Sequence, residues 1–441
     1  MSTKMRESVW DRDGVIAGIL ESTKIPRMAK VQQLFDKSKI EDIPKAIEAE
    51  FNRPEIAKTI NKGANIAITA GSRGIANIGL LTREIVRNVK RLGAKPFIVP
   101  AMGSHGGATA KGQKEMLEGL GVTEEYVGAP IYSSMEVVHI GDTVDGKKVF
   151  IDKYAAESDG IIVAGRVKPH TAFRGEYESG IYKMMAIGLG KQKGAEETHE
   201  EGFGRMAYNV VTYGDTILKN APILFGLAFI ENAFDDTAII EAVEKDKIAQ
   251  REPELLEIAK SLMPAIEIKD FDVLIVDQIG KNFSGDGMDP NITATYCTPY
   301  ASGGPVVQRY VVLDLSEETH GNALGAGMAD LGTKRLFDKI DFDAAYPNAL
   351  TCTVLMGAKV PVIMKNDELA IKAAIYTCVD IDKENPRIIR IANSSHIDTI
   401  MVSEVLAKEV EENSKLKLLE PFKELDFDAE GNLEIQGAEN G

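Results

Sequence analysis

The stretch 159–199, DGIIVAGRVKPHTAFRGEYESGIYKMMAIGLGKQKGAEETH, is the part of this sequence that best indicates its fold. It opens with the apolar run 161–164 (IIVA), bounded by glycines, which is typical of a short buried strand. In an open α/β sheet, small molecules bind outside the carboxyl ends of the strands. Lys168 and His170 follow this strand directly, so the sequence predicts ligand chemistry at this point.

A lysine in apolar surroundings is the second feature of this stretch. Lys183 lies among Ile181, Met184 and Ile187, and an amine held among apolar groups can become a reactive nucleophile. The commoner explanation for such a lysine is a side chain that reaches from an apolar helix face to water. His199 lies in an acidic segment, which by itself indicates a solvated surface.

Two earlier segments repeat the order of strand, polar loop and helix. A strand at 65–69 leads into a glycine loop with Arg73, and a strand at 96–100 leads into a second loop with His105. Right-handed crossovers place the carboxyl ends of successive parallel strands on one side of a sheet. We therefore expect an α/β fold in which Arg73, His105 and His170 lie over the same sheet edge.

Chain length sets the expected number of domains. A chain of 441 residues exceeds the roughly 250–300 residues at which one core stops growing, so we expect two domains. A helix closed by Pro264 and a new strand near residue 272 mark the boundary between them. The sequence predicts one α/β domain at 1–268 and a second at 269–404, with the segment 405–441 packing back on the first.

Composition excludes several classes of protein. The 67 acidic residues outnumber the 51 basic ones, and a net charge of -16 argues against a protein that binds nucleic acid through its phosphates. The 3 cysteines form no CxxC pair, so neither a disulfide framework nor a thiolate metal site is indicated, and a reducing cytoplasm is expected. No apolar run approaches the roughly 20 residues that span a bilayer, so we expect no membrane insertion.

Some of these features also have ordinary structural explanations. His105, between glycines, is as compatible with an exposed turn as with a catalytic role. His139 falls on the strand of a predicted hairpin and is expected to be structural. The glycine loop 71–74 lacks both the Walker lysine spacing and the GxGxxG arrangement, so neither a nucleoside triphosphate site nor a dinucleotide site is indicated.

The residues of these loops also form an ordered set that resembles a known family. Ser72-Arg73, Gly103-Ser104-His105, Lys168-Pro169-His170, Gly180-x-x-Lys183 and His199 together resemble the nickel-dependent lactate racemase (LarA-type) family. The likeness is strongest between residues 65 and 199. It implies two α/β domains with the active site in the cleft between them, and an isomerase that acts as a racemase or epimerase on a 2-hydroxy acid.

The resemblance also implies a cofactor and a role for each residue. The cofactor is a nickel-pincer nucleotide (pyridinium-3-thioamide-5-thiocarboxylic acid mononucleotide), made by cofactor-biosynthesis enzymes and attached covalently to Lys183. His199 is the implied nickel ligand, and Ser72 and Arg73 are the implied cofactor contacts. His105 and His170 are the implied acid/base pair.

The sequence departs from the family pattern where a substrate would be recognised. Ala70 stands where the family commonly has an aspartate, and the loop between His170 and Lys183 is longer than in the lactate enzyme. That loop carries Arg174 and Tyr177, which we predict to bind substrate. In the second domain, Gln278 and Lys281 have the chemistry of the family's substrate-binding residues. These differences suggest a 2-hydroxy acid other than lactate, such as a larger hydroxy or sugar acid.

A hydride route explains these residue types. Removing the carbinol hydrogen as a proton would form a carbanion beside a carboxylate, which is a poor prospect without strong electrophilic help. By resemblance, one histidine takes the hydroxyl proton while the hydride passes to the cofactor, leaving a planar 2-oxo acid. Two bases are needed because the hydroxyl points in opposite directions in the two isomers.

Two other functions fit the same residues. A metal-dependent hydrolase or lyase would use His105, His170 and His199 around zinc or iron, with Lys183 as base. A non-catalytic nucleotide-binding homologue would keep the fold and lack the chemistry. Metal analysis separates the three hypotheses. Nickel is expected for the racemase, zinc or iron for the hydrolase or lyase, and no metal for the non-catalytic homologue.

Overall fold

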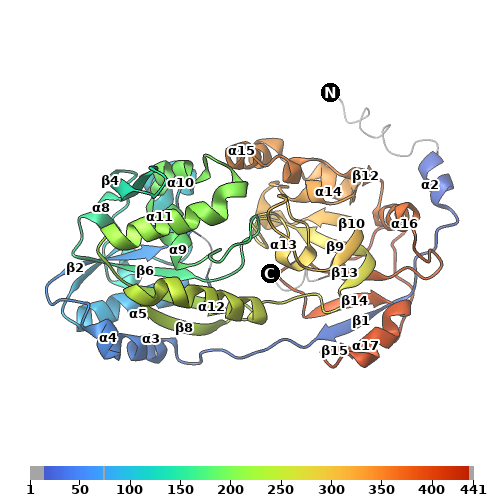
Figure 1. Cartoon of the computed structure of the whole chain (residues 1–441). Coiled ribbons are helices and arrows are strands. Elements are labelled where there is room, and N and C mark those ends of the chain that lie inside the picture. The colour runs from blue at the N-terminus through green and yellow to red at the C-terminus, as the bar shows by residue number, and fades with distance from the viewer. Residues whose placement is uncertain (1–13, 73–74, 437–441) are drawn as a thin grey trace. The chain divides into compact units, whose positions relative to one another are not determined.

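The computed structural model describes residues 14–72 and 75–436 (Figure 1). The chain divides into two compact units. One is Asp36–Met263, and the other joins Met1–Phe35 to Pro264–Gly441. Each unit contains a mainly parallel sheet with helices packed against it, so the predicted α/β class is confirmed.

A five-stranded sheet forms the centre of the Asp36–Met263 unit. Its spatial order is β3 (Lys95–Pro100), β2 (Asn65–Ala70), β6 (Gly160–Arg166), β7 (Ile223–Glu231) and β8 (Thr237–Glu244). The first four strands are parallel, and β8 runs antiparallel to β7. Unbroken apolar runs are expected in parallel strands because both faces of such a sheet are buried.

Strand β6 shows directly that both faces of this sheet are covered. Ile161 and Val163 belong to one apolar cluster, whereas Ile162 and Ala164 belong to another. This separation follows because successive side chains of a strand point to opposite faces. The first cluster includes residues of the helices near Lys183 and the second includes residues of α3 (Ile43–Asn52) and α5 (Ile78–Arg91).

The other α-helices of this unit, the π-helix after Lys183 and a β-hairpin complete it. They are α4 (Pro54–Ala57), α6 (Ala110–Gly119), α7 (Glu124–Val127), β4 (Val137–Asp142), β5 (Lys148–Asp152), α8 (Lys153–Ala156), α9 (Ile181–Lys183), the π-helix η2 (Met184–Leu189), α10 (Lys191–His199), α11 (Met206–Asn220) and α12 (Ile248–Leu262). The Thr109 side chain accepts a hydrogen bond from the Gly112 backbone amide and so caps the start of α6.

The second unit is built on an eight-stranded sheet. Its order is β12 (Val362–Met364), β11 (Leu331–Thr333), β10 (Val306–Leu315), β9 (Asp270–Ile279), β13 (Ile388–Ile391), β14 (Thr399–Ser403), β1 (Met28–Gln33) and β15 (Leu416–Leu418). Strands β12 to β13 are parallel, and the last three are antiparallel to their neighbours. The α-helices of this unit are α2 (Val15–Leu20), α13 (Pro290–Thr293), α14 (Lys334–Asp338), α15 (Phe342–Cys352), α16 (Asp367–Thr377) and α17 (Ala407–Glu412).

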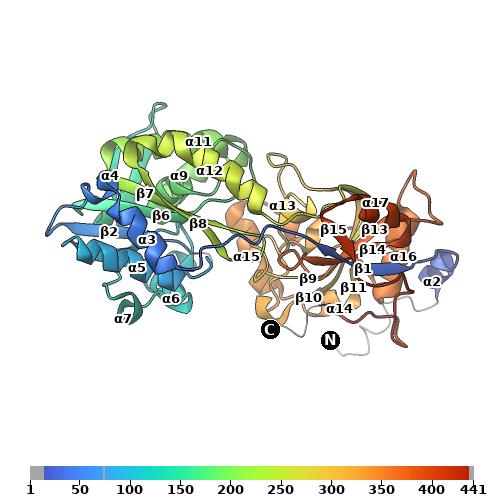
Figure 2. The same cartoon turned by 90° about the horizontal axis from the view of Figure 1, so that it is seen from below.

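The boundaries of the units differ from the predicted ones at both ends of the chain. Strand β1 pairs with β14 and β15, and all three lie side by side in both views (Figures 1 and 2). Leu433 is buried in the core of the same unit. The N-terminal strand and the segment after residue 405 therefore complete the second sheet and its core, because strand pairing joins residues that no local pattern connects.

Candidate active site

Three polar loops leave neighbouring parallel strands at one edge of the first sheet. Ser72 follows β2, His105 follows β3 and His170 follows β6. Strands β3, β2 and β6 are adjacent and parallel, so their carboxyl ends share that edge. The expectation that these strands belong to one parallel sheet is confirmed. Arg73 lies outside the described residues.

The helix that carries Lys183 packs against two of these loops. A Cβ atom on Gly71, in the loop after β2, would lie 3.7 Å from the side chain of Met184. A Cβ atom on Gly103, in the loop after β3, would lie 3.3 Å from the side chain of Ile187. Both neighbours belong to the π-helix that follows Lys183, and π-helical turns are frequent at functional sites.

The His105 ring is held by the loop of the neighbouring strand. Its Nδ1 atom lies 2.5 Å from Ser72 Oγ, and the residue is exposed. Its backbone carbonyl accepts a hydrogen bond of 3.2 Å from Gln113 Nε2. The contact between Nδ1 and the serine hydroxyl fixes the orientation of the ring.

The His170 loop is braced by a buried carboxylate. The His170 amide donates to Glu178 Oε2 at 2.7 Å, and Glu178 is buried. Arg174 Nη1 donates to the His170 carbonyl at 2.5 Å and to Glu178 Oε2 at 3.2 Å. His170 Nδ1 accepts from the Ala172 amide at 3.0 Å, so the neutral ring carries its proton on Nε2.

His199 has the hydrogen bonding expected of a neutral metal ligand. Nδ1 lies 2.6 Å from the Ala195 carbonyl oxygen, to which it donates, and the other ring nitrogen is thereby left unprotonated in the neutral form. Desolvation lowers the pKa of His199 and outweighs the hydrogen bond to the Ala195 carbonyl, which raises it, and the positive charge of nearby Lys183 lowers it further. A metal binds the neutral form of imidazole, so both effects favour coordination.

Phe203 connects two of the histidines. Its ring centroid lies 6.0 Å from that of His199, in an edge-on arrangement, and 6.5 Å from that of His170. Together with the electrostatic contact between Lys183 and His199, this aromatic ring places three of the predicted residues in one region of the unit. The loops of Ser72 and His105 reach the same region through the π-helix.

Glu252 is a site residue that the sequence analysis missed. It is buried in α12, and its Oε2 accepts from the Tyr182 amide at 3.0 Å, directly before Lys183. Burial raises the pKa of Glu252 to about 8. A Cβ atom on Gly180 would lie 2.0 Å from Glu252 Oε1, which explains the glycine three residues before the lysine. The sequence analysis predicted this helix only from residue 253, so Glu252 fell directly outside it, whereas α12 begins at Ile248.

Tyr177 does not occupy the position predicted for it. Its side chain is buried, stacks on Tyr182 with ring centroids 3.9 Å apart, and donates its hydroxyl hydrogen to the Ala249 carbonyl at 2.6 Å. This is the environment of a core residue, because the ring is removed from solvent and the hydroxyl has a backbone partner. The burial of the ring does not favour contact with a substrate, and the role of Tyr177 stays a prediction.

The predicted residues of the second unit lie at the carboxyl end of β9. Gln278 is near the end of this strand, and its backbone N–H donates to the Ala392 carbonyl at 3.0 Å. Lys281 follows in the next loop, where Nζ donates to the Gly285 carbonyl at 2.6 Å. Both are partly buried and occupy the edge at which parallel strands present ligand-binding loops.

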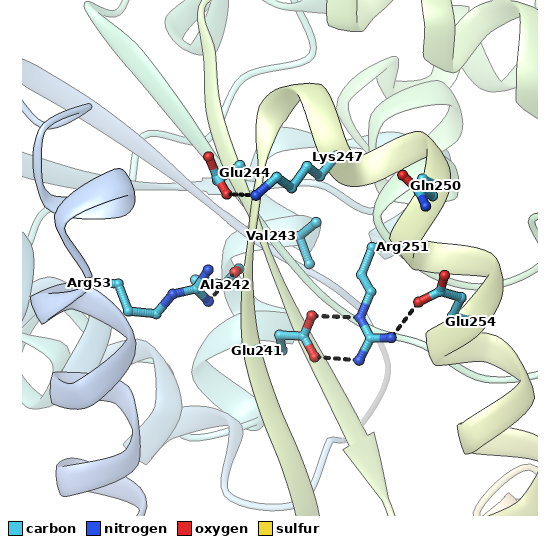
Figure 3. Close-up of a pocket in the computed structure, with 9 residues that line it drawn as sticks. All are labelled: Arg53, Glu241, Ala242, Val243, Glu244, Lys247, Gln250, Arg251 and Glu254. Carbon is cyan, nitrogen blue, oxygen red and sulfur yellow. Dashed lines mark hydrogen bonds and ion pairs between the residues drawn. The ribbon is translucent and has the colours of Figure 1, made fainter.

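A surface hollow beside β8 is a poor alternative to this site. Figure 3 shows that both oxygens of Glu241 pair with Arg251 and that Glu244 pairs with Lys247. In the antiparallel pairing of β8 with β7, Glu244 lies opposite Phe225, near the start of β7. The hollow therefore lies toward the amino edge of the parallel strands, opposite the histidine loops, and its charged side chains neutralise one another.

Within residues 14–72 and 75–436, no group of three or more His, Cys, Asp or Glu side chains is placed to hold a metal ion. His105, His170 and His199 thus do not form the three-histidine site that a metal-dependent hydrolase would need. In the same part of the chain, no helix is both long and apolar enough to cross a membrane.

Comparison with known proteins identifies one family. Residues 14–208 match the model of the lactate racemase N-terminal domain, and this range contains Ser72, His105, His170, Lys183 and His199. No curated protein matches the chain. Among solved structures, the lactate racemase apoprotein from Thermoanaerobacterium thermosaccharolyticum is similar at 16% identity and a TM-score of 0.43, over 65% of this chain and 74% of that chain. The family resemblance predicted from the sequence is confirmed over residues 14–208.

Proposed function

We propose that this chain, whose residues 14–208 match the model of the lactate racemase N-terminal domain, interconverts the isomers of a 2-hydroxy acid. The observation that carries the proposal is the arrangement at one sheet edge. There, two histidines follow different parallel strands beside the helical segment from α9 to α10, which supplies a lysine and a third histidine. That arrangement offers a cofactor attachment point, a metal ligand and two separate proton-transfer groups.

The residues present fit a nickel-pincer nucleotide. Lys183 would hold the cofactor covalently, and His199 Nε2 would bind its nickel, since Nδ1 is already used by the Ala195 carbonyl. Ser72 and Arg73 would contact the nucleotide. When bound, the cofactor would accept the hydride of the carbinol carbon and return it to either face.

The two histidines would handle the hydroxyl proton. His105 exchanges a proton at Nε2 while Ser72 holds Nδ1. His170 is held in the form that carries its proton on Nε2, so in this conformation it donates to a ligand oxygen. To accept a proton at Nε2, it must shift its own proton to Nδ1, and the Ala172 amide must then turn away. Isomerisation requires one ring that starts neutral and accepts the hydroxyl proton at Nε2, and a second ring that starts protonated and returns a proton; the two histidines exchange these roles when the direction reverses.

Binding of the substrate carboxylate requires a local cation, because the net charge of -16 repels anions. Lys281 is the better candidate, with Gln278 as a neutral hydrogen-bonding partner. Arg174 is less suited, since its Nη1 braces the His170 loop. A cytoplasmic setting, with cofactor-biosynthesis enzymes as partners, belongs to the same proposal.

Isomerisation by loaded protein tests the proposal. The chain is produced together with cofactor-biosynthesis enzymes and assayed with both isomers of lactate, malate and longer sugar acids. His105→Gln and His170→Gln should each lower isomerisation in both directions by about 100-fold or more. His139→Gln is the matched control, because His139 is an exposed hairpin residue that contacts Asp142.

Peptide mass mapping supplies the second readout. The Lys183 peptide of active protein should carry a cofactor adduct, and Lys183→Arg should abolish it. An active preparation with unmodified Lys183 would contradict the assignment of the lysine. Isomerisation at the wild-type rate by either His105→Gln or His170→Gln would remove that histidine from the mechanism.

A further inference from the structure

Lys191 is a buried lysine outside the residues assigned above. It is the first residue of α10, the helix that ends at His199, and its relative exposure is 0%. Its backbone has a φ of 53°, in the left-handed region that residues with a Cβ atom rarely adopt. A lysine kept in this conformation and without solvent must be held by its side-chain partners.

Three elements supply those partners. Lys191 Nζ donates to the Pro100 carbonyl at the end of β3 and, at 3.2 Å, to Gln113 Oε1 on α6. It also forms an ion pair of 3.1 Å with Asp152 Oδ2 at the end of β5, and Asp152 is likewise buried. Two of these oxygens accept hydrogen bonds from the ammonium ion, and Asp152 Oδ2 adds the opposite charge.

Gln113 links Lys191 to the His105 loop by hydrogen bonds. Its other amide atom, Nε2, donates to the Gly103 carbonyl at 2.8 Å and to the His105 carbonyl at 3.2 Å. The ammonium ion fixes the orientation of this buried amide, because a flipped amide would point N–H groups at Lys191. The oxygen therefore faces the lysine, and the two N–H groups face the loop.

We propose that Lys191 is a positioning residue that fixes the His105 loop, through Gln113, relative to the helix ending at His199. This inference rests on the proposed function, in which His105 exchanges a proton with a ligand near the metal held by His199. Lys191 and Gln113 touch neither substrate nor cofactor. They hold one proton-transfer group at a set place relative to the metal ligand.

Two pairs of variants separate positioning from ordinary stabilisation. Gln113→Leu removes the link to the His105 loop and leaves the Lys191–Asp152 ion pair in place. Lys191→Met removes the ammonium ion and leaves Asp152 as an unpaired buried charge, so this variant can fail to fold. The double variant Lys191→Met with Asp152→Asn removes both charges and keeps the test available. Lys193→Met is the control, because Lys193 is half exposed and pairs with Glu197 on the same helix.

The first measurement uses protein without cofactor. The chain has 6 histidines, so nuclear magnetic resonance of imidazole nitrogens labelled with ¹⁵N gives a short set of signals, in which His105 is identified by its loss in His105→Gln. Gln113→Leu and the double variant should move or broaden the His105 signals. The signals of His396, in the other unit, should stay in place, as should all signals in Lys193→Met.

The second measurement uses loaded enzyme. Gln113→Leu should lower kcat by about 10-fold to 100-fold with KM nearly unchanged, since small displacements of a reacting group have effects of this size. The Lys183 adduct should remain at the wild-type level. Unchanged His105 signals and unchanged kcat in folded Gln113→Leu would overturn the inference. If the His105 signals move but no variant or wild type isomerises any 2-hydroxy acid, the positioning role stands and the proposed function fails.

Discussion

The buried carboxyl of Glu252 should make the Asp36–Met263 unit lose stability as pH rises. Burial raises its pKa from the ordinary value of 4.5 to about 8 in the folded protein. Below pH 4.5, both the folded and the unfolded chain carry the protonated form, so the ionisation of Glu252 adds no pH dependence to the free energy of unfolding. Between these two values, the unfolded chain ionises while the folded chain stays protonated, so ionisation favours unfolding.

The size of the effect follows from the two pKa values. Each pH unit in this window lowers the free energy of unfolding by about 1.4 kcal/mol. From pH 5.5 to 7.5, the loss is therefore about 3 kcal/mol, and across the whole window it is about 5 kcal/mol. Glu252→Gln cannot ionise, so its stability relative to the wild type should rise by these amounts. Any cost of the amide itself does not depend on pH and cancels from the slope.

Buried methionines provide an assay confined to this unit. Met185 and Met206 have relative exposures of 0% and 1%, and peroxide oxidises a methionine readily once unfolding exposes it. Short peroxide pulses across a urea series, followed by mass spectrometry, give the free energy of unfolding at each pH. Glu257→Gln is the control, since the Glu257 side chain is 72% exposed. A difference between Glu252→Gln and wild type that stays constant from pH 5.5 to 7.5 would refute the reasoning.

Three further substitutions test other contacts. Arg390→Met should destabilise the second unit by about 3–5 kcal/mol because it leaves the buried Asp277 carboxylate unpaired, and adding Asp277→Leu should restore most of the loss when peroxide pulses are followed at Met28 and Met288, buried methionines of that unit. Ser72→Ala removes the hydrogen bond to His105 Nδ1 and should lower kcat about 10-fold with little change in KM; an unchanged kcat would show that this contact does not orient the ring. Phe203→Ala removes the ring that contacts two histidines and should weaken nickel retention during dialysis against a chelator, while wild-type retention would rule out a role in holding the metal ligand.

The strands and loops of the candidate site were accessible from local sequence. The apolar runs at 65–69, 96–100 and 161–164 fall within β2, β3 and β6, and the polar loops after them share one sheet edge. The prediction of these strands was correct because a buried parallel strand has a short-range apolar pattern in the sequence. The handedness of crossovers then fixes which strand ends meet. Tyr177 shows the limit, since the same loop composition is compatible with a side chain that points outward or inward.

The contacts that hold these loops were decided only by tertiary structure. Lys191 and Gln113 are 78 positions apart, and Tyr182 and Glu252 are 70 apart, so no local window contains both partners. The pairing of β1 with β14 is more distant still. A local pattern shows which residues are apolar and in what period. Which remote oxygen comes to lie beside a buried amine is settled when the whole chain packs, because an unpaired buried charge costs enough free energy to disfavour every packing that leaves it alone.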